Sequence, residues 1–274
     1  MTYVELHAHS AYSFLDGASH PEELVLRAAE LGYEALALTD HDGVYGSLEF
    51  AHAAKLAGVR PLTGAEVTLS GGAHVTLLVE SARGYANLCR LLTAAHAGTR
   101  PKEGELLPPA LDPALLAVAN EGLVCLSGCA REGLGVRDPN AAVRLAQAFG
   151  ERFYVELQRP FERGDASRNA RLRDLAAHIG AQTVVTGNVH AHSRRRTALQ
   201  DVLVSIRHRT SLDGSERERR GEPAPRTSSA HARAISSTSQ WRRKKPASPS
   251  SSISASSSRS RRRASPSSFR FRGG

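Results

Sequence analysis

Two histidines near the start of the chain, His7 and His9, have a spacing suited to binding a metal ion. The apolar residues Val4, Leu6 and Ala8 alternate with them, which is the pattern of a β-strand. Residues two apart on a strand point to the same side, so both imidazoles face the same way. Two such imidazoles at a strand end can hold one divalent ion at nitrogen–metal distances of about 2.0–2.1 Å. The alternative is a surface strand with two solvated histidines.

Seven further side chains of ligand type lie at an end of an expected strand or in the turn that follows it. They are Asp16, His41, Glu66, His74, Cys129, Asn188 and His190. Because the carboxyl ends of parallel strands share one face, residues spread over about 180 positions can converge there. The mixture of imidazole, carboxylate and thiolate suits Zn²⁺, Mn²⁺ or Fe²⁺ better than Ca²⁺. The set exceeds the four ligands of one tetrahedral ion, so we expect two or three divalent ions, zinc or manganese before magnesium or iron.

Several of these positions, and the two aspartates that flank His41, also have structural interpretations. Asp40 and Asp42 can cap the helix that follows them instead of entering a site. Cys129 can be a small buried apolar residue, and His74 can be a histidine at the edge of a strand. Glu66 is harder to explain in this way, because a carboxylate on an apolar strand needs a partner when it is buried.

The elements that must position these residues are short apolar runs alternating with amphipathic segments, up to about Arg207. We expect strands at 2–8, 33–39, 59–68, 73–80, 123–127, 153–158 and 182–189. We expect helices at 21–32, 45–57, 84–97, 140–150, 165–180 and 195–207, and a proline-rich loop at 98–113. The alternation predicts an α/β fold with a parallel sheet and crossover helices, either closed as a barrel or open.

The composition indicates one sizeable domain, which we place at residues 1–221. The chain has 274 residues, of which 41% are hydrophobic, enough for a proper core. No apolar run reaches the roughly 18 residues that a membrane span needs, and no basic-then-apolar leader opens the chain. Three cysteines, an odd number, do not suggest a disulfide framework, so we expect a cytoplasmic protein without a membrane partner.

The net charge of +9 is concentrated at the end of the chain. Residues 222–274 carry twelve Arg or Lys against one Glu, which leaves the first 221 residues with a net charge of −2. Affinity for nucleic acid therefore does not follow from the whole-chain charge. Seventeen serines and few large apolar residues predict that 222–274 is a disordered tail.

Three interpretations of that segment remain open. It can be a basic arm for nucleic acid or a targeting signal, or a solvated tail without a fold. We favour a third, the product of a frameshift, because GC-rich coding sequence read out of frame is rich in Ser, Arg, Ala and Pro.

Four motifs in order along the chain resemble the PHP domain family (polymerase and histidinol phosphatase). They are His7-Ala8-His9, Thr39-Asp40-His41, Gly64-Ala65-Glu66 and Asn188-Val189-His190. Residues 5–19 and 37–46 are similar to the opening of bacterial C-family DNA polymerase alpha subunits. Residues 186–201 are most similar to the error-prone, damage-induced branch of that family. The resemblance covers about residues 3–220.

This resemblance implies a distorted seven-stranded β/α barrel of PHP type with up to three metal ions, held by the nine ligand candidates above. Asn188 departs from the family, which usually has Asp-x-His in its last motif. A neutral amide is a weaker ligand than a carboxylate, so occupancy of one metal position is in question. The family also implies DNA or nucleotide phosphates as substrates and, for full-length polymerases, a polymerase core and mutagenesis accessory proteins as partners.

The resemblance ends before the palm, the part of the family polymerases that carries the catalytic aspartates. We therefore interpret the chain as the N-terminal PHP portion of an error-prone DNA polymerase, truncated or frameshifted after about residue 220. Such a portion cannot polymerise DNA by itself.

The chemistry expected of the ligand set is metal-dependent phosphoester hydrolysis. A bound divalent ion lowers the pKa of water from 15.7 to about 7, and the activated water attacks phosphorus in line. The candidates for catalysis are His7, His9, Asp40 and His41, of which a protonated histidine or Asp40 assists the leaving oxygen. Three arginines after the last motif either meet substrate phosphates or simply begin a solvated helix: Arg194, Arg195 and Arg196.

A stand-alone PHP phosphatase is an alternative with the same chemistry, and two other classes of function remain open. The metals can stabilise a structural or docking module that has no turnover, and Asn188 favours this interpretation. The chain can also be an amidohydrolase, since those enzymes begin with His-x-His on a barrel strand. Many of them bridge two metals with a carbamylated lysine, but none of the four lysines lies on an expected strand: Lys55, Lys102, Lys244 and Lys245.

Overall fold

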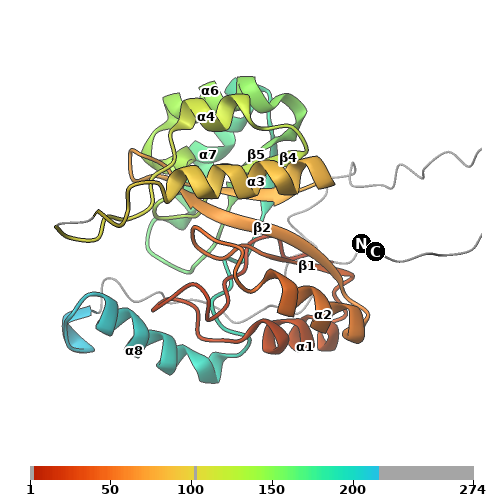
Figure 1. Ribbon diagram of the computed structural model, residues 1–274, viewed down its shortest axis with the longest axis vertical. Coiled ribbons are helices and arrows are strands. Elements are labelled where there is room, and N and C mark those ends of the chain that lie inside the picture. The colour runs from red at the N-terminus through yellow and green to blue at the C-terminus, as the bar shows by residue number, and fades with distance from the viewer. Residues whose placement is uncertain (1–2, 102–103, 216–274) are drawn as a thin grey trace, which may run out of the picture. The chain divides into compact units, whose positions relative to one another are not determined.

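The described part of the computed structural model, residues 3–101 and 104–215, contains a mixed sheet of six strands in sequence order (Figure 1). The strands are β1 (Ala35–Leu38), β2 (Arg60–Thr68), β3 (His74–Val79), β4 (Leu123–Leu126), β5 (Phe153–Leu157) and β6 (Gln182–Val185). β1 pairs with β2 in parallel, and β4, β5 and β6 are mutually parallel. The expected α/β class is therefore confirmed.

The sheet is mixed, whereas the sequence predicts a parallel sheet. β3 runs antiparallel to both β2 and β4. Only the short segment 69–73, with Gly72 at φ 77°, joins β2 to β3, and a parallel crossover needs a dozen or more residues. The reversal places His74, at the amino end of β3, opposite Thr68 at the carboxyl end of β2.

The first expected strand, at residues 2–8, appears only as isolated bridges, so the count of seven strands is not confirmed. Glu5 bridges Leu36 of β1, and Ala8 bridges Val189 just beyond β6, both in parallel. The backbone N–H of Val189 donates to the carbonyl of His7 at 2.9 Å. The N-terminal segment therefore lies between the first and last strands, and it links the two edges of the sheet.

Eight α-helices occur in the described residues, and six of them match the expected segments within a few residues. They are α1 (Pro21–Glu30), α2 (Ser47–Ala57), α3 (Ala82–Ala95), α4 (Pro113–Val118), α5 (Leu134–Arg137), α6 (Pro139–Phe149), α7 (Asp165–Ile179) and α8 (Thr197–Arg207). The short helices α4 and α5 were not expected. Gly58 and Gly180 end α2 and α7 in the left-handed conformation, which glycine adopts without strain.

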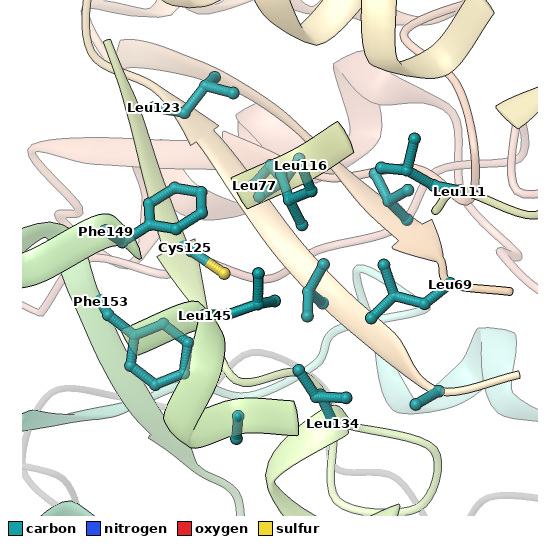
Figure 2. Close-up of a cluster of buried hydrophobic side chains, with 14 of the residues drawn as sticks. Leu69, Leu77, Leu111, Leu116, Leu123, Cys125, Leu134, Leu145, Phe149 and Phe153 are labelled. Carbon is teal, nitrogen blue, oxygen red and sulfur yellow. The ribbon is translucent and has the colours of Figure 1, made fainter. Parts of the chain in front are cut away.

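Two of the three buried apolar clusters are layers that pack helices against the sheet. α3, α4, α6 and α7 cover one side of it, whereas α1 and α2 pack beside β1 (Figure 1). Figure 2 shows the larger layer, in which Leu77, Cys125 and Phe153 from the sheet meet Leu145 and Phe149 of α6. Burying each large side chain contributes about 1.5–3 kcal/mol, so these layers keep the strand ends in fixed positions.

Two further observations concern the cysteines and the helices. Cys89, Cys125 and Cys129 do not form disulfides with one another. In the part of the chain that the structure describes, no helix combines the length and apolar character that crossing a bilayer requires. The expectations for residues 222–274, a disordered tail or a frameshift product, concern residues outside the described range.

Candidate metal centre

Side chains from six separate segments meet where the parallel strands end. The N-terminal segment carries His7 and His9, and the turn after β1 carries His41. Glu66 lies near the carboxyl end of β2, and His74 begins β3. The turn that follows the N-terminal segment carries Asp16, and the segment that follows β6 carries Asn188 and His190.

Glu66 is the carboxylate around which most of these imidazoles gather. Its Oε2 atom lies 3.2 Å from Nε2 of His7, 3.1 Å from Nε2 of His9 and 3.5 Å from Nδ1 of His41. Its Oε1 atom lies 3.0 Å from Nδ1 of His74. Burial alone would raise the pKa of Glu66, but His41 and His7 hold that pKa well below its usual range. Glu66 is therefore a buried anion surrounded by imidazoles.

Asp16 is a second buried carboxylate at the same place. Its Oδ2 atom lies 2.9 Å from Nε2 of His41 and 3.4 Å from Nε2 of His190. Arg207, the last residue of α8, reaches the same oxygen with Nη1 at 3.2 Å. Sequence reasoning did not identify Arg207, because nothing in an amphipathic helix marks one arginine as pointing into a site.

Within the described residues, three groups of side chains are close enough to hold an ion, and in each group the ligand atoms lie within 4.8 Å of one another. The groups are His7, His9 and Glu66; His41, Glu66 and His74; and His9, His41 and His190. Each group shares at least one member with the others, which is the arrangement expected of adjacent ions with bridging ligands. The donors are imidazole nitrogens and carboxylate oxygens, so the residues present fit Zn²⁺ or Mn²⁺.

The imidazole rings are packed against one another. The ring centroids of His9 and His41 lie 4.4 Å apart, and those of His9 and His190 are at the same separation. Burial, together with His190 and His41, lowers the pKa of His9 well below its usual range. His9 is therefore neutral near pH 7, which is the form that coordinates a metal.

A carboxylate that we did not predict, Glu156 of β5, orients the first histidine. Nδ1 of His7 donates to Oε1 of Glu156 at 2.7 Å, and Thr186 and Gln158 donate to the same oxygen. Burial would lower the pKa of His7, but Glu156 and Glu66 raise it to about 10. The signal in the sequence was the one noted at Glu66, since Glu156 is also a carboxylate within an apolar strand.

Glu5 is a further buried carboxylate, and it ties the N-terminal segment to the end of the sheet. It accepts hydrogen bonds from the Tyr3 hydroxyl at 2.7 Å and from the backbone N–H of His7 at 3.0 Å. The backbone N–H of Gly187 also donates to it, at 2.9 Å. Burial raises the pKa of Glu5 to about 7. Glu5 therefore holds the backbone at His7 in the N-terminal segment and at Gly187 just after β6.

Asp40, which follows β1, binds the loop after His7-Ala8-His9. Its Oδ1 atom accepts from the backbone N–H of Ser10 at 2.6 Å and from the Ser13 hydroxyl at 2.7 Å. Asp42 instead accepts from the N–H of Thr68 at 2.7 Å. Neither carboxylate caps α2, whose first turn has no side-chain cap.

Asn188 and Cys129 lie at the side of the cluster. Oδ1 of Asn188 is 3.1 Å from Nε2 of His9, and the residue has φ 50°. Cys129 is buried, and its Sγ accepts the backbone N–H of Glu132 at 3.4 Å. Cys129 and Asn188 line the same small cavity, and Cys129 belongs to none of the three groups above.

The three arginines after the last motif have different surroundings. Arg196 forms an ion pair with Glu23 of α1, whereas Arg194 and Arg195 are exposed. All three belong to a short 3₁₀ turn that leads into α8.

Known proteins resemble this chain in sequence. The PHP domain family matches residues 5–160. The error-prone DNA polymerase of Symbiobacterium thermophilum is 41% identical over 238 residues, which are 80% of this chain and 22% of that protein. The error-prone DNA polymerase of Mycobacterium tuberculosis is 41% identical over 235 residues, 78% of this chain and 21% of that protein. The chain thus spans about a fifth of the length of these curated relatives.

Two solved structures share the fold. A protein described as a metal-dependent phosphoesterase, from Bifidobacterium adolescentis, has a TM-score of 0.53 at 15% identity, over 69% of this chain and 88% of the other. An amidohydrolase from Chromobacterium violaceum has a TM-score of 0.52 at 20% identity, over 69% of this chain and 87% of the other. At these identities the likeness extends to the fold alone.

Proposed function

Because the chain belongs to the PHP domain family, we propose that it is the PHP portion of an error-prone DNA polymerase and that it hydrolyses phosphoesters of DNA or nucleotides with bound divalent ions. One observation carries the proposal, the overlap of three ligand groups around Glu66 and His9. In this arrangement His7, His9 and His74 share one carboxylate with His41, so two or three ions would lie side by side.

The bound ions would supply an activated water and neutralise charge on the phosphate. The residues of this chain position the reaction. Glu156 holds the His7 ring so that Nε2 faces Glu66. Arg207, beside Asp16, provides a fixed positive charge for a phosphate oxygen. We assign Asp40 a positioning role, because its carboxylate is engaged by Ser10 and Ser13. We assign His41 to the metal ligands, because it belongs to two of the three groups.

The test is release of product from a 3′-labelled single-stranded oligonucleotide by the full chain with Mn²⁺ or Zn²⁺. Wild type is expected to cleave, and His7→Ala and Glu66→Ala are expected to lose that activity. His52→Ala, which changes an exposed histidine on α2, is the matched control and should cleave like wild type. Cleavage by Glu66→Ala at the wild-type rate would rule out this site as the source of the activity.

A second candidate function is a metal-stabilised docking module without turnover. The observation that favours it is Asn188, an amide next to His9 where a carboxylate would bind an ion more strongly. If added metal raises the melting temperature while no phosphoester is cleaved under any metal, this second function is supported and the first is rejected.

The amidohydrolase alternative has less support. Lys55 lies on α2 and not on a strand, and the other lysines lie outside the described residues. We propose a cytoplasmic location, which suits three cysteines that form no disulfide.

A further inference from the structure

A cleft beside the metal centre has the chemistry of a binding site for a single nucleic-acid strand. The cleft, with a volume of about 610 Å³, is formed by the segment between β5 and α7 and by the first turns of α7. Its lining includes Arg159, Phe161, Glu162, Asn169 and Arg173. Such a volume accommodates a nucleotide-sized ligand. None of these residues belongs to the candidate metal centre.

Phe161 and Arg159 form an exposed flat surface at this cleft. The guanidinium carbon of Arg159 lies 5.5 Å from the centre of the Phe161 ring, and the ring is 55% exposed. Phe161 has φ 65°, a backbone conformation that is unusual for a bulky residue. Strain of this kind persists where the surrounding structure imposes it, and it is found preferentially at functional sites.

The segment that carries Phe161 is held rigidly by the start of α7. The carboxylate of Asp165 accepts the backbone N–H groups of Phe161 and Glu162 at 2.8 and 3.2 Å. Asp165 also forms an ion pair with Arg168, and Asn169 donates to the carbonyl of Gln158 at 2.9 Å. The aromatic ring is therefore presented to solvent by a fixed support, which lowers the entropy cost of binding to it.

The charge of the cleft suits a polyanion. Arg159 and Arg173 are exposed, and within the described residues neither pairs with a carboxylate. Nearby Arg131 is paired with Glu162, which neutralises that acid. Guanidinium groups without a carboxylate partner, beside an exposed aromatic ring, are the elements with which proteins bind single strands. The arginines contact phosphates and the ring stacks on a base.

The cleft adjoins a small cavity that borders the metal centre. Glu162 lines both the cleft and the small neighbouring cavity, whose wall includes Cys129 and Asn188. Asn188 in turn lies 3.1 Å from His9. A strand bound along this line would place one nucleotide on Phe161 while its neighbour approaches the metal ligands.

We propose that the Arg159–Phe161–Arg173 cleft binds an unstacked nucleotide of single-stranded nucleic acid and directs the strand toward the metal centre. Phe161 and Arg159 stack on the base, and Arg173 contacts a phosphate. The inference deepens the proposed function by naming a subsite for its substrate, but its test measures binding and not hydrolysis.

The test is photocrosslinking of the full chain to oligonucleotides that contain 5-iododeoxyuridine or 5-iodouridine, with chelator present so that no cleavage occurs. We expect the label on a peptide within residues 159–173, for DNA, RNA or both. Comparison of the DNA and RNA oligonucleotides identifies which of the two the cleft prefers. The basic residues 222–274 can add affinity of their own, so the position of the crosslink decides the outcome. A label that maps only elsewhere, or no crosslink at all, overturns the proposal.

Affinity measurements on variants give the size of the effect. By fluorescence anisotropy, Phe161→Ala should bind the strand about tenfold more weakly, as expected for one lost base stack, and Phe161→Tyr should bind like wild type. Arg173→Gln should reduce the salt dependence of binding by about 0.7 in the log–log slope, the value for one phosphate contact on a single strand.

The matched controls are Tyr85→Ala, an exposed aromatic residue on α3, and Arg60→Gln at the far end of β2. If a Phe161→Ala protein loses the crosslink but wild type cleaves nothing, the subsite stands and the proposed hydrolysis fails. If wild type cleaves and crosslinks map away from the cleft, hydrolysis stands and the subsite fails.

Discussion

Nδ1 of His7 lies 2.7 Å from Oε1 of Glu156, a residue 149 positions further along the chain. The contact joins the N-terminal segment to β5 across the sheet, and it leaves Nε2 of His7 directed at Glu66. A carboxylate behind a coordinating histidine fixes the orientation of the ring and raises its basicity. Glu156 is therefore central to how this chain would bind metal, although Glu156 itself belongs to none of the three ligand groups.

Glu156→Gln should weaken metal binding about 10- to 100-fold, the usual effect of removing such a partner. The amide keeps the shape of the side chain but no longer accepts a charge-assisted hydrogen bond from His7. Competition with a fluorescent chelator measures the change, with Glu151→Gln at an exposed position as control. Equal affinity in wild type and Glu156→Gln would mean that His7 is not a ligand.

Asn188→Asp should add an ion or tighten one, because a carboxylate replaces an amide 3.1 Å from His9. Metal content after loading with Zn²⁺ and removal of free ion is the measurement. Asn169→Asp, on α7, introduces the same change away from the cluster and should leave the content unchanged. If Asn188→Asp binds no more metal than wild type, position 188 does not limit occupancy.

Glu5 should make stability depend on pH. Its pKa is raised from 4.5 to about 7 by burial, so the folded state binds the proton more tightly than the unfolded state does. The stability that the protonated form contributes is complete below about pH 4.5 and is lost as pH rises through about 7, amounting to roughly 3 kcal/mol.

Urea unfolding of wild type and Glu5→Gln, with chelator present, tests this dependence. The free energy of unfolding of wild type, relative to Glu5→Gln, should fall between pH 5 and pH 7.5. A difference that stays constant over that range, or rises, would show that Glu5 is ionised throughout.

Leu77→Ala should lower the free energy of unfolding by about 2–5 kcal/mol, because Leu77 of β3 is completely buried in the larger apolar layer (Figure 2). Leu48→Ala removes the same atoms from a side chain that is 83% exposed on α2, and it should change stability by less than about 0.5 kcal/mol. Similar losses in the two variants would contradict the placement of β3 against this core.

Much of the site follows from local patterns in the sequence. Glu66 is recognisable because a carboxylate within an apolar strand needs a partner, and the structure supplies four imidazoles. The same reasoning applied to β5 would have identified Glu156. The antiparallel direction of β3 could also have been predicted, because the segment 69–73 is too short for a parallel crossover.

Other features could not be predicted, because they depend on contacts between distant segments. Arg207 looks like any arginine at the end of an amphipathic helix until α8 is placed beside Asp16. The first expected strand forms isolated bridges at Glu5 and Ala8, with a different partner at each, and alternation of apolar residues does not reveal how a segment is paired. Long-range docking therefore accounts for what the patterns missed.

The most direct test of this account is the metal content of wild type and Glu66→Gln, measured by elemental analysis after loading the full chain with Zn²⁺ or Mn²⁺. The amide preserves the size of the side chain but removes the anion that four histidines share. We expect at least two ions per chain in wild type and fewer than one in Glu66→Gln. Equal metal content in the two proteins would contradict a metal centre built around Glu66.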